Sequence, residues 1–144
     1  MKRIILLVIS AMLITGCNSP KEQRLECSKE TMQNENKVIE TIITNYDKDN
    51  VSNMEIKTET ILDDKYLEYI DTFEKQINSS FEKYKGKKGI DINITKADSK
   101  IVLNMIINVL SLDDETKKDL SITDTYSSYE NAKKILKNDG YLCK

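Results

Sequence analysis

The apolar residues of this chain change their spacing twice along the sequence, and this limits the folds that it can adopt. The first part of the chain favours strands, because residues 38–46 are rich in β-branched side chains and residues 54–62 alternate with charged ones. The segment 47–50 between them consists of residues that are typical of turns. We expect an antiparallel meander with strands over 25–32, 36–46 and 51–62.

The middle of the chain has a helical period instead. Its large apolar residues recur at every third or fourth position: Tyr66, Ile70, Phe73, Ile77, Phe81 and Tyr84. This spacing places them on one face of a helix of about five turns. Asp63 and Asp64 supply a cap and a favourable charge at its start, and Gly86 supplies a stop. The spacing predicts one helix over 63–86 that covers the apolar face of the sheet.

Alternation returns after this helix. Residues 90–95 and 101–110 predict two further strands, and the second is placed inside the sheet because it is apolar on both sides. Residues 113–120 predict one or two helical turns. Ser127, with Glu130 three residues later, resembles a capping box that opens a helix over 128–138, and Gly140 ends this helix.

These patterns together predict an α+β fold. We expect an antiparallel sheet of about five strands in the order β-β-β-α-β-β-α, with the helices packed on one face. An apolar open face of the sheet would indicate a partner site, and a charged one would indicate a solvated surface.

The first seventeen residues, MKRIILLVISAMLITGC, are typical of an export leader. Lys2 and Arg3 precede an apolar run that is too short to span a bilayer, which requires about 20 apolar residues. Leu13 to Cys17 resembles the lipobox of bacterial lipoproteins, a family in which the cysteine receives a diacylglyceryl group and a signal peptidase cuts before it. The resemblance implies cleavage between Gly16 and Cys17, lipid attachment to Cys17, and an anchor on the extracytoplasmic face of the cell membrane. An ordinary secretory signal and a membrane helix remain as alternatives.

Removal of residues 1–16 from the 144 leaves 128, which is enough for one domain. We expect residues 17–24 to be the lipidated N-terminus and tether, and residues 25–144 to be a single α+β domain. Because Lys2 and Arg3 leave with the signal, 20 of the 22 basic residues face 24 acidic ones, and the net charge of −4 argues against nucleic acid as a partner. The frequent Lys, Asn and Ile favour a low-GC Gram-positive source.

Two cysteines remain once Cys17 carries lipid, and they lie near the two ends of the domain. An even number of exported cysteines predicts a disulfide between Cys27 and Cys143. A bridge over this separation would restrict the unfolded chain by about 4–5 kcal/mol. Two free thiols are one alternative, and a redox pair, which lacks a Cys-x-x-Cys motif, is another. The bridge would also hold both ends of the domain beside the tether.

Motifs for catalysis or metal binding are scarce. The chain has no histidine, which removes Ser-His-Asp and Cys-His catalysis and most zinc sites. We interpret the acidic pairs at 63–64 and 113–115 as helix caps, and 47–50 as a turn without the glycine and distal glutamate of an EF-hand. The basic segment 85–89 is no P-loop, although contact with anionic wall polymers remains an alternative. We therefore expect no catalytic residues, cofactor or metal.

Three tyrosines, Tyr126, Tyr129 and Tyr141, gather in the C-terminal part of the chain. Tyrosine combines apolar area with a polar tip, so the cluster is either a ligand surface or structural packing, and we favour packing. The expected function is a lipid-anchored binding or interaction module at the cell surface, with a protein, a wall polymer or a small molecule as partner. Two alternatives are a precursor whose cleaved leader acts as a peptide signal, and a histidine-free enzyme built on a buried Lys–carboxylate pair.

Several of these features together resemble one family. The leader, the opening strand Leu25-Glu26-Cys27, the aromatic helix and the closing segment 128–144 with its Cys143 resemble the YehR-type family of small bacterial lipoproteins. The resemblance spans most of the mature chain. It implies the architecture described above, and it brings no activity and no catalytic residues.

Overall fold

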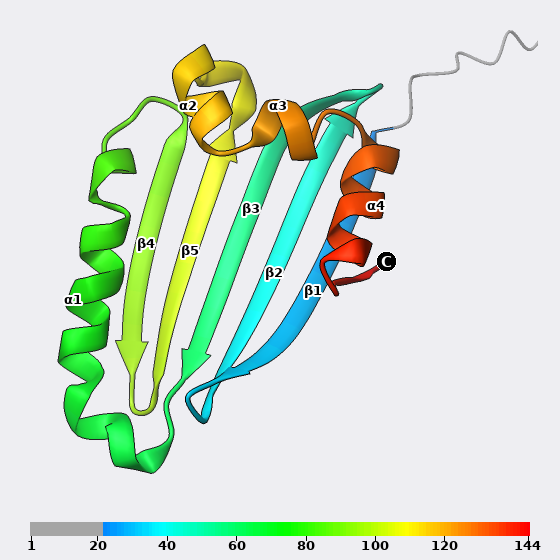
Figure 1. Cartoon of the computed structure of the whole chain (residues 1–144). Helices are drawn as coiled ribbons and strands as arrows, with labels where there is room; N and C mark the ends of the chain where they lie inside the picture. The colour runs from blue at the N-terminus through cyan, green and yellow to red at the C-terminus, as the bar shows by residue number, and fades with distance from the viewer. Residues whose placement is uncertain (1–21) are drawn as a thin grey trace, which may run out of the picture.

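The computed structural model describes residues 22–144, which form a six-stranded antiparallel sheet in the order β4-β5-β3-β2-β1-β6 (Figure 1). The α+β fold and the three-stranded meander are confirmed. The sixth strand is a two-residue segment at the C-terminus, where the sequence predicts only extended chain. The strands are β1 (Gln23–Gln33), β2 (Asn36–Asp47), β3 (Asn50–Ile61), β4 (Ile90–Ala97), β5 (Lys100–Asn108) and β6 (Leu142–Cys143).

The cross-strand register gathers the core on one face of the sheet. Cys27 lies opposite Ile42, Ile42 opposite Ile56, and Ile56 opposite Met105, so one apolar row crosses four strands. The core on this face also contains residues of the C-terminal helices, which therefore cover it: Ile122, Tyr126, Ala132 and Leu136.

The opposite face of the sheet mixes aliphatic and charged side chains. Lys57 and Lys100 both pair there with Glu59, at 2.7 and 3.2 Å. Its large exposed apolar residues include Met32 and Ile106, which are 64% and 48% exposed. Since charged groups are interspersed with the aliphatic ones, this face has the composition of a solvated surface.

The single helix predicted over 63–86 is wrong, because the segment consists of three pieces. They are η1 (Asp64–Tyr69), α1 (Ile70–Ser80) and η2 (Glu82–Tyr84), of which η1 and η2 are 3₁₀ turns. The cap is as predicted, since the Asp63 side chain accepts from the Lys65 amide. At the other end, Asn78 and Ser80 donate to the carbonyls four residues earlier. Such bonds compete with the helical pattern, and α1 ends at this point.

The C-terminal region contains η3 (Val109–Ser111), α2 (Asp114–Asp119), α3 (Ile122–Thr125) and α4 (Tyr129–Asn138). The predicted cap of α4 is wrong by one residue, because Ser128 rather than Ser127 accepts from the Asn131 amide. The end is as predicted: Gly140 has a φ of +89°, and the Tyr141 amide donates to the Leu136 carbonyl. This is a Schellman motif, for which glycine is the favoured residue.

The predicted signal peptide, its cleavage point at Gly16 and Cys17, and most of the tether lie outside the described residues. Within residues 22–144, no helix has the length and apolar composition needed to cross a membrane.

Candidate functional site

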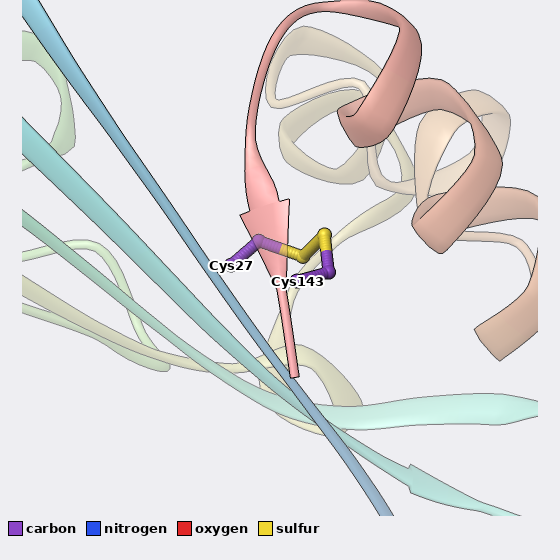
Figure 2. Close-up of a disulfide and its surroundings, with 2 residues drawn as sticks. All are labelled: Cys27 and Cys143. Carbon is purple, nitrogen blue, oxygen red and sulfur yellow. A yellow bond between two sulfur atoms is a disulfide. The ribbon is translucent and has the colours of Figure 1, made fainter.

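A disulfide joins the two ends of the described chain. Cys27 on β1 lies opposite Cys143 on β6, and their sulfur atoms are bonded (Figure 2). The Lys144 amide then donates to the Glu26 carbonyl at 2.9 Å. The predicted bridge is therefore formed, and the prediction that Cys27 and Cys143 lie together is confirmed.

A groove opens on the helix-bearing face of the sheet, between the sheet and α1. Its volume is about 410 Å³, which is within the usual range of small-molecule sites. Strands β2, β3 and β5 form its floor, α1 and Phe81 form a wall, and the β1–β2 turn lies at one end. The floor and wall residues are Val38, Glu40, Thr58, Thr60, Leu103, Phe73, Ile77 and Phe81.

The groove exists because α1 does not pack tightly on the sheet. None of the residues of α1 is buried, although Phe73 and Ile77 face the groove. Two of the sheet residues beneath have short hydroxyl-bearing side chains, since Thr58 and Thr60 continue the inward row of Met54 and Ile56. The aromatic stripe that predicts a tightly covering helix therefore lines an open surface.

Glu40 provides the one charged side chain among the described residues that line the groove. Its Oε2 accepts a hydrogen bond of 2.8 Å from the Tyr141 hydroxyl. Burial, followed by this hydrogen bond, raises the pKa of Tyr141, so its hydroxyl stays protonated as a donor. The sequence carries a signal for this site, because Glu40 shares the inward phase of Val38 and Ile42 in β2. The sequence prediction did not include Glu40.

Two of the three C-terminal tyrosines, Tyr126 and Tyr129, pack in or against the core. Tyr126 is 7% exposed in the core, and burial raises its pKa to about 12. Tyr129 meets the buried Tyr46 edge-to-face with ring centroids 5.9 Å apart. Burial also raises the pKa of Tyr46. Only Tyr141 has its hydroxyl on a residue of the groove.

The acidic pairs act as the sequence predicts. Asp63 caps η1, and Asp113 accepts from the Thr116 amide at 2.7 Å. This backbone hydrogen bond lowers the pKa of Asp113. Among residues 22–144, no cluster of three or more acidic or cysteine side chains is arranged to hold a metal ion.

The basic segment near residue 85 is tied to its neighbours. Lys83 and the Tyr84 hydroxyl both donate to Asp119, at 2.7 and 2.8 Å, and Lys87 donates to the Thr116 hydroxyl at 2.9 Å. The bonds to Asp119 lower the pKa of its carboxyl group, chiefly through Lys83. Among the described ion pairs the least exposed side chain is Glu59, which is 21% exposed. A buried Lys–carboxylate pair is thus not formed among residues 22–144.

Two solved structures have a similar fold. The solution structure of the YehR protein of Escherichia coli has a TM-score of 0.54 and 13% identity, over 85% of this chain and 91% of that one. The solution structure of a protein from Streptococcus pneumoniae TIGR4 has a TM-score of 0.51 and 12% identity, over 100% of this chain and 98% of that one. No family model and no curated protein sequence matches the chain. At these identities the comparison shows that this chain shares its α+β fold with both proteins.

Proposed function

We propose that this protein is a lipid-anchored, extracytoplasmic binding protein and that the groove between α1 and the sheet is its ligand site. The groove is the observation that carries this proposal. It combines apolar and hydroxyl-bearing side chains on its floor and wall with one carboxylate held by a tyrosine hydroxyl. Small-molecule sites commonly have this composition, in which a few fixed polar groups orient a ligand on apolar surface.

The position of the groove also supports the proposal. The chain that leads back to Cys17 leaves the sheet at Gln23, whereas the groove reaches Gln33 and Asn34 at the other end of β1. A strand rises about 3.3 Å per residue, so these two ends are roughly 33 Å apart. A lipid on Cys17 would keep the first end near the membrane and leave the groove open to the extracytoplasmic space.

Metabolic labelling with a palmitate analogue tests the anchor. We expect the wild-type protein to take up the label and to fractionate with membranes, because two acyl chains anchor a protein stably. Cys17→Ala should remove both properties. Cys143→Ala is the matched control, since it removes a cysteine of the disulfide and should still be labelled. An unlabelled wild-type protein, or a labelled Cys17→Ala variant, would contradict the anchor.

Binding of the uncharged dye Nile red tests the groove. Thr58→Phe places a ring in the groove and should abolish the fluorescence increase that the wild-type protein gives. Lys57→Phe is the matched control, because neighbouring strand residues point to opposite faces and its ring lies on the other side of the sheet. If Thr58→Phe and Lys57→Phe changed the fluorescence increase of the wild-type protein equally, the dye would bind outside the groove. The groove would then be removed from the proposal.

A further inference from the structure

We infer that the groove selects small amphipathic cations, that is, molecules with an apolar body and one ammonium group, and that Glu40 binds the ammonium. This inference rests on the proposed function, since it names the ligand class of the same groove.

The described lining residues of the groove have one formal charge, which is negative. Glu40 brings this charge. The other lining residues are aliphatic, aromatic or hydroxyl-bearing, apart from the amides Gln33, Asn34 and Asn36 near the β1–β2 turn. An anionic ligand would meet an uncompensated carboxylate in a partly desolvated site, which is costly. A neutral apolar ligand would leave that carboxylate without a counter-charge. A cation with an apolar body matches both parts of the surface.

The Glu40 carboxylate is oriented by a hydrogen bond and can accept others. The Tyr141 hydroxyl donates to Oε2 and fixes the orientation of the carboxylate. A carboxylate has about four acceptor positions, so further donors can be accepted. Among the ion pairs of the described residues, none involves Glu40.

The nearest candidate for an internal counter-ion is Lys29, which lies opposite Glu40 in the β1–β2 pairing. Its ammonium instead donates to the Asp139 carbonyl at 2.7 Å and lies 5.4 Å from the ring centroid of Tyr141. Tyr141 therefore contacts both residues: the Lys29 ammonium lies over its ring, and its hydroxyl donates to Glu40. The carboxylate remains available for a cation from outside.

The chain that forms the helical wall of the groove is also rich in acidic residues. The wall helix α1 and the chain that leads into it, residues 63–80, have more carboxylates than ammonium groups. The acidic residues there are Asp63, Asp64, Glu68, Asp71 and Glu74, and the basic ones are Lys65 and Lys75. An excess of one sign of charge around a recess raises the local concentration of the opposite ion. Phe73 and Phe81 on the wall additionally offer aromatic surface to the ligand.

Titration with three matched probes tests the inference: 4-phenylbutylammonium, 4-phenylbutanol and 4-phenylbutanoate, followed by protein NMR chemical shifts. They share one apolar body and differ in charge. We expect the cation to bind about tenfold more tightly than the alcohol, with shifts at β2, β3 and α1, and the carboxylate to bind most weakly. Glu40→Gln keeps the size of the side chain and an acceptor for Tyr141, and should reduce the affinity for the cation about tenfold while leaving the alcohol unchanged.

Glu55→Gln is the control, because it makes the same charge change on the opposite face of the sheet. It should leave the affinity for the cation within about twofold of the wild type. Equal affinities for the three probes, with shifts in the groove, would overturn the cation selectivity and leave the groove as a binding site. No shift with any probe would overturn both the selectivity and the groove. An equal effect of both glutamate variants would assign the selectivity to net charge and overturn the role of Glu40.

Discussion

The two helices that flank the sheet differ in how closely they cover it. Helix α4 buries Ala132 completely and Leu136 to 3% exposure, whereas α1 buries none of its residues. In Figure 1, α4 lies across the strand β1, and α1 runs beside β4, at the opposite edge of the sheet. The same face thus has one side built as core and one side that remains accessible.

The difference lies in how the two helices are held. Helix α4 is fixed from both ends, because the disulfide closes the chain directly after it and Tyr129 packs on Tyr46. Helix α1 has no buried residue, and surface ion pairs join it to the sheet: Lys96 of β4 pairs with Asp71 and Glu74. Exposed ion pairs orient an element but contribute little to stability. Helix α4 therefore contributes to the stability of the fold, whereas α1 leaves the groove beside it accessible.

Removal of the disulfide should have the largest effect on the side of α4. The double variant Cys27→Ala, Cys143→Ala frees a loop between residues 116 apart, and we expect the free energy of unfolding to fall by about 4–5 kcal/mol. Urea titration of wild type and variant measures the difference. Reductant should lower the stability of the wild-type protein and leave that of the variant unchanged. A loss below about 1 kcal/mol would show that the packing of α4 does not depend on the bridge.

Truncation of one aliphatic side chain in each helix tests the comparison directly. Leu136→Ala should cost about 2–5 kcal/mol, because it leaves a cavity in a closed core. Ile77→Ala should cost about 1 kcal/mol or less, because Ile77 borders the open groove. Chemical denaturation measures both. Similar costs for the two variants would show that α1 packs as tightly as α4.

The strands and the existence of the helices follow from local patterns in the sequence. The alternation over residues 54–62 and the spacing from Tyr66 to Tyr84 reflect geometry within one element, so they predict β3 and the helical region. The breaks at Tyr69 and Phe81 do not follow from spacing, because 3₁₀ and α turns place apolar residues on similar faces. The choice of Ser128 over Ser127 as the cap does not follow from the sequence either, since adjacent serines cap equally well.

The candidate site follows less readily from the sequence, since it depends on the distance between a helix and a sheet. The apolar stripe of α1 is the same whether the helix lies against the sheet or stands away from it, so it predicts which face is covered and not how closely. The inward phase of Glu40 is a local signal for the site. Its partner Tyr141 is 101 residues away, and only the tertiary fold brings the two together.

Alkaline titration should reveal the closed side through its buried phenol. Burial raises the pKa of Tyr126 from 10.0 to about 12. Above pH 10 the unfolded state ionises while the folded state stays neutral, so the stability present below pH 10 falls as the pH rises to about 12. Tyr126→Phe should reduce this loss by about 1–3 kcal/mol. Tyr69→Phe is the control, since Tyr69 is 50% exposed. Identical pH profiles for the two variants would contradict the buried position of Tyr126.

The smallest expected effect concerns the contacts that hold α1. Lys96→Met removes the ammonium that pairs with Asp71 and Glu74 and keeps the length of the side chain. Global stability should change little, because these groups are exposed. Amide hydrogen exchange should nevertheless accelerate a few-fold in α1 and stay constant in α4, because local opening of α1 breaks no closed core. The pairing lowers the pKa of Asp71, so acidification through that pKa should reduce the protection factors of α1, which are corrected for the intrinsic pH dependence of exchange, more in the wild type than in the variant. Equal acceleration in both helices would show that α1 and α4 open as one unit, and the two sides of the sheet would then differ in packing but not in stability.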